Sequence, residues 1–192
     1  MSPAWTVGLV ADTHIPDRTR RLPEAVLQVF DRAGVCCILH AGDVVTPGVL
    51  AQLARLAPVY AVRGNRDWLM LRLPLRRTVQ VGPFRLGLVH GHGALARYVR
   101  DKVAYWLGHP LPFRRFVLRA RAACPQADVV VFGHIHYPMI RRFGAQWVVN
   151  PGSPLGNDRS PVPPSVGLLH LDADRGARPE IVFLNPPAPT AP

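Results

Sequence analysis

Five short apolar segments of the sequence each end directly in residues that can bind a metal ion or a phosphate. The groups that follow these segments are Asp12-Thr13-His14, His40-Ala41-Gly42-Asp43, Arg63-Gly64-Asn65-Arg66-Asp67, His90-Gly91-His92 and Gly133-His134-Ile135-His136. Six of the eight histidines of the chain lie in these groups. Imidazole with carboxylate suits Mn, Fe, Co, Ni or Zn, whereas the absence of cysteine ligands argues against a structural zinc or iron–sulfur site. The pattern therefore predicts a transition-metal site.

The spacing within two of these groups supports convergent side chains. In extended backbone, residues i and i+2 point the same way, so the side chains of Asp12 and His14 can converge, as can those of His134 and His136. The glycines among the groups permit sharp turns and leave room beside a metal.

The first half of the chain predicts strands and helices in alternation. Strands are expected over residues 7–11, 35–40 and 59–62, with helices over 23–33 and 46–56. The second helix should start with Thr46 as N-cap and turn Leu50, Leu53 and Ala54 inward. This order is typical of a parallel sheet covered by helices, and such sheets bind ligands at the carboxyl ends of their strands.

The second half predicts a different arrangement. An antiparallel hairpin is expected over residues 78–90, and further strands over 129–132, 139–142, 146–150, 166–172 and 180–184. Residues 94–123 read as a helical insertion broken near 108–112. We predict an α/β fold in which two mixed β-sheets pack face to face between helices, a four-layer αββα sandwich, in one domain over residues 1–185. Residues 186–192 form a Pro/Ala tail that we expect to be disordered.

The chain carries a formal charge of +11, which indicates anionic partners or a coding bias toward arginine, since Lys102 is the only lysine. Seven basic residues and one acid, Asp101, lie between Arg97 and Arg121. This basic segment fits a lid that recruits anionic substrate, a nucleic-acid surface, a subunit interface in a homo-oligomer, or an amphipathic helix pair with a solvated arginine face. Without an apolar run of about 20 residues or a signal peptide, we expect no membrane contact and a cytoplasmic location, with reduced, buried cysteines.

The ordered motifs D-x-H, G-D, G-N-x-D, H-G-H and G-H-x-H over residues 7–172 resemble those of the calcineurin-like metallophosphoesterase superfamily. With the small size of the chain and Asn150-Pro151-Gly152-Ser153, the sequence is most similar to the single-domain bacterial and archaeal phosphodiesterases of the YfcE type. The resemblance implies two metal ions that share Asp43. One would be held by Asp12, His14, Asp43 and His136, and the other by Asp43, Asn65, His90 and His134.

The expected cofactors are two divalent ions, with Mn as the first candidate and Fe, Ni, Co or Zn as alternatives. A site that holds two such ions predicts a metal-dependent phosphoesterase. Such a site attracts phosphate and makes a metal-bridging hydroxide available for in-line attack near neutral pH. The expected substrate is a small phosphoester, and the reaction that of a phosphodiesterase. The alternatives are a nuclease or nucleotide phosphatase that uses the basic segment, and a non-catalytic scaffold similar to a retromer subunit, against which the full ligand set argues.

Arg66 departs from the common G-N-H-D motif, in which histidine is thought to protonate the leaving group. A guanidinium is a poor proton donor, but it can bind a phosphate oxygen and stabilise charge in the transition state. Arg66 is therefore either a catalytic residue or a surface arginine in a turn. Its presence predicts a preference for good leaving groups, or protonation by another residue such as His92.

Other polar residues in the motifs have two interpretations each. His92 is a candidate phosphate contact, and Asp67 a candidate that holds the Asn65 loop by hydrogen bonds. His40 could orient Asp43 or fill a strand end. Asn150 and Ser153 could line the site or form a structural turn. His109 and His170 lie outside the groups and are expected to be incidental.

Overall fold

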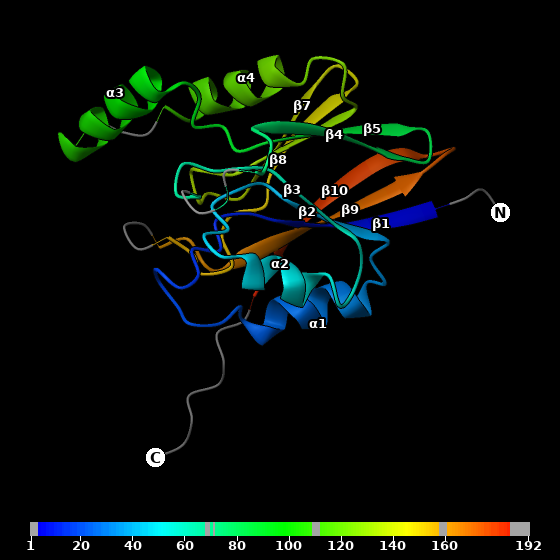
Figure 1. The fold of residues 1–192 in the computed structure, drawn as a ribbon. Helices are drawn as coiled ribbons and strands as arrows, with labels where there is room; N and C mark the ends of the chain where they lie inside the picture. The colour runs from blue at the N-terminus through cyan, green and yellow to red at the C-terminus, as the bar shows by residue number, and fades with distance from the viewer. Residues whose placement is uncertain (1–3, 68–69, 71, 109–111, 158–160, 185–192) are drawn as a thin grey trace.

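Two β-sheets form the centre of the molecule and pack face to face, with helices on both outer faces (Figure 1). This computed structural model describes residues 4–67, 70, 72–108, 112–157 and 161–184, and within these ranges each sheet has five strands. The predicted α/β sandwich of two mixed sheets flanked by helices is confirmed.

The first sheet has the strand order β10-β9-β1-β2-β3. Its strands are β10 (Gly176–Phe183), β9 (Ser165–Asp172), β1 (Ala4–Val10), β2 (Cys37–His40) and β3 (Val59–Ala61). β1, β2 and β3 are parallel, as the alternating pattern predicted, while β9 pairs antiparallel with β1 and β10. Helices α1 (Glu24–Arg32) and α2 (Pro47–Leu53) connect the parallel strands and cover the outer face of this sheet.

The second sheet has the order β4-β5-β6-β8-β7. Its strands are β4 (Arg76–Val81), β5 (Phe84–Val89), β6 (Val129–Phe132), β8 (Gln146–Asn150) and β7 (Met139–Phe143). β4 and β5 form the predicted antiparallel hairpin, whereas β5, β6 and β8 are parallel. Helices α3 (Leu95–Trp106) and α4 (Phe113–Ala123) follow β5, so the segment predicted to be helical forms two helices.

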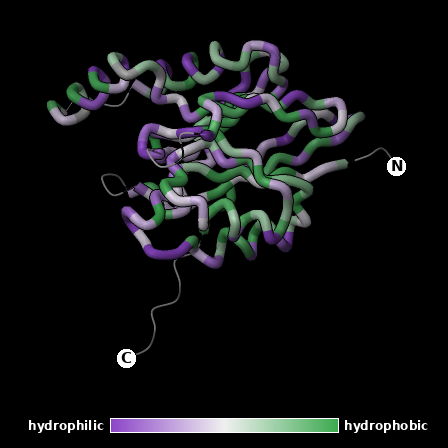
Figure 2. The backbone as a smooth tube through the Cα atoms, in the orientation of Figure 1, coloured by the Kyte–Doolittle hydropathy of each residue, from purple (hydrophilic) through white to green (hydrophobic). Residues whose placement is uncertain are grey.

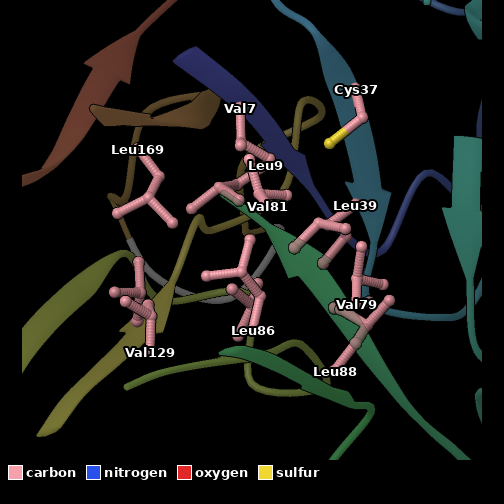
Figure 3. Close-up of a cluster of buried hydrophobic side chains, with 14 of the residues drawn as sticks. Val7, Leu9, Cys37, Leu39, Val79, Val81, Leu86, Leu88, Val129 and Leu169 are labelled. Atoms are coloured by element: carbon pink, nitrogen blue, oxygen red, sulfur yellow. The ribbon is translucent and has the colours of Figure 1, made fainter. Parts of the chain in front are cut away.

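Three apolar layers hold these elements together. Val7, Leu9 and Leu86 belong to the core between the two sheets, part of which Figure 3 shows. Val10, on the opposite face of β1, packs in the layer beneath α1 and α2. β1 is thus buried on both faces, which explains its continuous apolar sequence. Figure 2 shows the hydrophobic residues concentrated along the strands between the helical layers.

The two helices on the second sheet differ in how they are held. α4 buries Phe116, Val117 and Ala120 against β6 and β8. By contrast, α3 extends beyond the body of the sheets (Figure 1), and its Val99 and Trp106 are 50% and 67% exposed. α3 contacts the rest of the protein through the ion pair between Asp101 and Arg119 and through the Tyr98 ring, which lies against His92 and His134.

Several local predictions need correction. Thr46 occupies the N-cap position of α2, but its side chain makes no capping hydrogen bond. This helix ends at Leu53, so Val49 and Leu53 are its buried residues while Ala54 is exposed. Cys36 precedes β2 and is exposed, unlike Cys37 and Cys124, and all three are free thiols. The tail 186–192 lies outside the described residues. Within the described part, no helix is both long and apolar enough to cross a membrane.

Candidate metal centre

The seven side chains predicted to bind metal come together where the two sheets meet at the carboxyl ends of their strands. Loops after β1, β2 and β3 bring Asp12, His14, Asp43 and Asn65 from the first sheet. Loops after β5 and β6 bring His90, His134 and His136 from the second. The structure thus places the residues of five separate motifs in one cluster, while their roles as ligands remain a prediction.

One half of the cluster contains Asp12, His14 and His136, whose potential ligand atoms lie within 4.8 Å of one another. His14 Nε2 is 3.0 Å from His136 Nε2, and the two rings stack with their centroids 4.9 Å apart. His136 Nε2 lies 3.7 Å from Asp12 Oδ1. Two imidazoles and a carboxylate at these distances match the donor set of a transition metal.

The other half is arranged around Asn65. Its Oδ1 lies 3.0 Å from His90 Nε2 and 2.9 Å from His134 Nδ1. Asp43 lies between the halves, because its Oδ2 is 3.7 Å from His14 Nε2 and its Oδ1 is 3.5 Å from His90 Nε2. The potential ligand atoms of Asp12, Asp43 and His90 also lie within 4.8 Å of one another.

Five of the seven residues have a backbone conformation that non-glycine residues rarely adopt. Positive φ angles between 47° and 76° occur at Asp12, His14, Asp43, His134 and His136. Such angles cost free energy and persist where surrounding structure enforces them, most often at functional sites. Here they turn each side chain sharply off the end of its strand and into the cluster.

Close backbone packing leaves no room for larger residues beneath the cluster. A Cβ atom added at Gly64 would lie 2.1 Å from Asp43 Oδ1 and 2.3 Å from Asp43 N. At Gly42, where φ is +91°, a Cβ would lie 2.7 Å from His90 Nδ1. The glycines of the G-D and G-N-x-D motifs therefore allow two loops to touch behind Asp43.

Asp67 holds these loops together. Its buried carboxylate accepts hydrogen bonds from the backbone N–H groups of Gly64 at 2.7 Å, Asp43 at 3.0 Å and Val45 at 2.7 Å. It does not line the cavity of the site. The contacts are those of a positioning residue for the Asn65 loop, as the hydrogen-bonding interpretation predicted.

A second set of hydrogen bonds supports the strained loops from behind. The Ser153 hydroxyl donates to the Asp12 carbonyl at 2.9 Å, and Asn150 Nδ2 donates to the Gly133 carbonyl at 2.8 Å. The His134 N–H donates to Asp12 Oδ2 at 2.8 Å. Asn150 and Ser153 are fully buried and do not line the cavity, which favours the structural interpretation of this turn.

Two histidines beside Asp43 have defined tautomers. His90 Nδ1 donates to the Ala41 carbonyl at 2.8 Å, an arrangement that commonly orients metal-bound histidines. His40 Nδ1 accepts from the Gly42 N–H, so its Nε2 donates to Thr13 Oγ1, which lies 3.3 Å from the Asp43 carbonyl. His40 therefore reaches the Asp43 backbone through Thr13, as an orienting residue would.

In the protein without bound metal, burial shifts the pKa values of aspartates and histidines in the cluster. Desolvation, reinforced by the charge of Asp43, raises the pKa of Asp12 well above 3.8. Desolvation likewise raises the pKa of Asp43. Burial and the neighbouring His136 lower the pKa of His14 to about 2, and burial lowers that of His134 well below 6.5. Neutral imidazoles are the form that binds metals.

Two observations test whether the cluster fits a metal. Asp12 Oδ1 is buried without a hydrogen-bond partner, which is costly unless a cation satisfies it. In addition, the His90 tautomer that donates through Nδ1 presents the lone pair of Nε2 to the lone pairs of Asn65 Oδ1, only 3.0 Å away. A cation between these acceptors removes the repulsion. The residues therefore fit divalent metal ions.

A cavity of about 280 Å³ opens onto the cluster. Its walls comprise His14, Arg18, Asp43, Asn65, Arg66, Tyr98, Asp101, Lys102, Phe116, His134, Ile135, His136 and Asn157. Sequence reasoning did not assign Arg18 to the site, although it follows the D-x-H motif. It also left the α3 and α4 residues unplaced, because the path of the basic segment over the site depends on tertiary packing.

Arg66 and His92 occupy different positions. The Arg66 side chain lines the cavity and is half exposed, and its Nε donates to Asp17 Oδ2 at 3.1 Å. His92 lies outside the cavity lining, with its ring centroid 5.3 Å from that of His90 and 6.4 Å from that of Tyr98. Burial and His90 lower the pKa of His92 to about 4, so it is neutral near pH 7 and a poor proton donor. The contacts do not support His92 as leaving-group acid.

Of the two histidines outside the motifs, the structure describes only His170, which lies away from the cluster. His170 on β9 is paired with Glu180 on β10, with His170 Nε2 3.1 Å from Glu180 Oε2. His109 falls outside the described residues.

The fold and the cluster together define an α/β sandwich with a candidate metal site between its two sheets. The chain belongs to the calcineurin-like phosphoesterase superfamily, whose domain model matches residues 6–174. Relatives of the chain are named probable metallophosphoesterases, and the chain is accordingly a metal-dependent phosphoesterase by family.

Three comparisons illustrate this relationship. A probable metallophosphoesterase of Methanothermobacter thermautotrophicus is 37% identical over 174 residues, which cover 88% of this chain and 87% of the relative. Wild-type Vps29 of Entamoeba histolytica, solved in complex with Zn²⁺, is 24% identical with a TM-score of 0.67, covering 94% and 99% of the two chains. A novel archaeal phosphodiesterase is 21% identical with a TM-score of 0.61, covering 92% and 99%. The two solved structures show the likeness of the fold alone.

Proposed function

We propose that the chain hydrolyses a small phosphodiester at a centre of two divalent transition-metal ions, with Mn²⁺ as the first candidate. The position of Asp43 carries the proposal, because its two oxygens face His14 on one side and His90 on the other. A carboxylate in this position can be shared by two cations. We assign one cation to Asp12, His14, Asp43 and His136, and the other to Asp43, Asn65, His90 and His134.

Bound divalent cations supply Lewis acidity and lower the pKa of coordinated water towards neutrality. The protein contributes the fixed geometry of the donor atoms and two arginines, Arg18 and Arg66, in the cavity wall. A guanidinium remains charged near neutral pH and can donate to phosphoryl oxygens as negative charge develops. Arg66 therefore binds and orients the phosphate rather than giving a proton to the leaving group.

The size of the cavity supports a small substrate. Its volume of about 280 Å³ is near the lower end of the range of about 300–1,000 Å³ that is common for small-molecule sites. Exposed arginines on α3 and α4, such as Arg97 and Arg114, are a reason to test nucleic acid as the alternative substrate.

The deciding experiment combines metal analysis with hydrolysis assays on the wild type and Asp43→Asn. Both proteins are reconstituted with Mn²⁺ and given bis-p-nitrophenyl phosphate, the monoester p-nitrophenyl phosphate and single-stranded DNA. We expect two equivalents of metal and diester turnover in the wild type. Asp43→Asn should lose metal and at least 100-fold in turnover, because it removes the charge facing both metal positions. Asp31→Asn, an exposed change on α1, is the matched control.

Other results would lead elsewhere. No diester turnover by the metal-loaded wild type would refute the phosphodiesterase and favour a binding protein of the same fold. Hydrolysis of DNA that falls steeply with added salt, while the small diester is cleaved poorly, would favour a nuclease.

A further inference from the structure

Helix α3 places one face over the cavity and leaves apolar residues on its adjoining face exposed. Tyr98, Asp101 and Lys102 line the cavity from this helix. Val99, Val103 and Trp106 on the same helix are 50%, 45% and 67% exposed. The inner face of α3 thus forms a wall opposite the histidine and aspartate cluster, and this wall contacts whatever the cavity holds.

The wall is aromatic where it meets the cluster. The Tyr98 ring centroid lies 6.0 Å from that of His134, with the two rings tilted by 58°. Phe116 on α4 lies 5.4 Å from the same His134 ring and forms the base of the wall. Of these two, Tyr98 is the more exposed to the cavity, since Phe116 is only 2% exposed. A flat group attached to a phosphate beside His134 would meet the Tyr98 ring.

The wall is also positively charged beyond the ring. Asp101 is already engaged, with its carboxylate oxygens 2.8 Å from Arg119 and 3.1 Å from Arg100. Lys102 forms no salt bridge with any described residue, and its ammonium group lies 5.9 Å from the Trp106 ring centroid. The negative charge of Asp101 is therefore neutralised by the two arginines, and the Lys102 ammonium group can pair with a ligand.

Arg119 fixes the wall to the rest of the site. From α4, its guanidinium donates to the Gly91 carbonyl at 3.0 Å and the His92 carbonyl at 2.9 Å, as well as to Asp101 on α3. Its side chain is 14% exposed. Because one partly buried cation joins both helices to the loop after β5, the position of Tyr98 relative to His134 is set by the fold.

We propose that this wall, formed by Tyr98, Lys102 and Phe116, is a subsite for the organic group of the substrate. It takes a phosphoester whose organic group is an aromatic ring that bears a second negative charge. The ring stacks on Tyr98, and the second charge pairs with Lys102. The inference rests on the proposed function for the position of the phosphate, and it adds the chemical class of the group attached to it.

The test measures binding of inert phosphonates, which are not hydrolysed, to the Mn²⁺-supplemented protein by calorimetry. The series consists of methylphosphonate, phenylphosphonate and 4-phosphonobenzoate, which add first a ring and then a second charge. We expect phenylphosphonate to bind about 3- to 10-fold tighter than methylphosphonate, as aromatic pairs allow. The carboxylate should add about 2- to 5-fold, which is typical of an exposed ion pair.

Variants assign each gain to its residue. Tyr98→Ala should bring the affinities for the methyl and phenyl compounds together, while Tyr98→Phe, which keeps the ring, should preserve the difference. Lys102→Gln should bind 4-phosphonobenzoate no more tightly than phenylphosphonate. Arg97→Gln, an exposed change of equal charge on the same helix, should still bind 4-phosphonobenzoate more tightly.

Equal binding of methylphosphonate and phenylphosphonate by the wild type would overturn the subsite while leaving the proposed function intact. An equal loss in Arg97→Gln and Lys102→Gln would overturn the role of Lys102, because it would reflect net charge alone. The expected series of affinities in a protein that hydrolyses no diester would instead reject the proposed function and support the subsite.

Discussion

At the scale of single residues, the site depends on the contact between two loops behind Asp43. The Arg66 N–H donates to Asp43 Oδ1 at 2.8 Å, and Asp67 binds the backbone of both loops. Gly64 packs against Asp43 so closely that its missing side chain is part of the geometry. Small changes at this contact should therefore move a proposed metal ligand without changing its chemistry.

Gly64→Ala tests this dependence on close packing. The new methyl group would overlap Asp43 Oδ1 and force the loops apart, so we expect metal affinity to fall at least 10-fold. The free energy of unfolding should fall by about 1–3 kcal/mol. Calorimetric titration with Mn²⁺ and urea denaturation measure the two effects.

Gly48→Ala is the matched control for this substitution. Gly48 is exposed on α2, and a Cβ there would meet nothing within 4 Å. It should leave metal binding unchanged and increase stability by up to about 1 kcal/mol. Equal metal affinity in Gly64→Ala and the wild type would show that the loop contact does not position Asp43.

The sequence predicted which residues gather at the site better than it predicted how they are held. Motif order and residue type suffice to bring Asp12, Asp43 and His134 to one edge, because parallel strands end together. The positive φ angles of these residues, and the three N–H groups bound by Asp67, depend on contacts between loops distant in the chain. His92 shows the same limit, since its motif did not reveal that its ring packs behind the cavity wall.

At the scale of elements, α3 is the least tightly packed helix around the site. Its apolar residues Val99, Val103 and Trp106 are exposed, and its contact with α4 passes through Asp101 and Arg119. The sequence placed both helices and the break between them, because helical periodicity is local. It could not show which face of α3 meets the cavity, since that depends on tertiary contacts such as the Asp101–Arg119 ion pair and the packing of Tyr98 against His134.

The ion pair predicts how α3 responds to acid. Burial alone would raise the pKa of Asp101, but hydrogen bonds and charge from Arg119 and Arg100 outweigh it and hold this pKa below 3.8. A lowered pKa in the folded protein means that the contact is fully present above pH 3.8 and is lost as pH falls through the lower, folded value. Hydrogen exchange of α3 amides should therefore show full protection above pH 3.8. This protection should be lost progressively as the pH falls from 3.8 through the lower pKa of Asp101 in the folded protein.

Asp101→Asn separates this contact from general acid unfolding. The variant cannot form the charged pair, so its α3 amides should exchange faster than those of the wild type at pH 5, by an opening free energy of about 1.5–3 kcal/mol. The two proteins should converge at low pH. Identical exchange of α3 in both proteins at pH 5 would mean that other contacts position the helix.

At the scale of the whole molecule, the site lies across the boundary between the two sheets. Asp12, His14, Asp43 and Asn65 extend from the first sheet, and His90, His134 and His136 from the second. An apolar core joins the sheets over most of their area, whereas at this edge polar groups with opposed lone pairs face each other. Metal ions held there would link the sheets at the edge where apolar packing ends.

Metal binding should consequently stabilise the entire fold. At Mn²⁺ concentrations of about 100 times Kd, the free energy of unfolding should rise by about 2.7 kcal/mol for each ion bound, and chelation should reverse the gain. The increase should fall by about half in His14→Gln, which removes a ligand of one ion, and equally in His134→Gln, which removes a ligand of the other. His170→Gln alters a histidine paired with Glu180 away from the cluster, so it should keep the full increase. Because each assigned ion takes ligands from both sheets, a full gain that is kept in one ligand variant and reduced in the other would place the metal on one sheet only, and the sheets would then be joined by their apolar core alone.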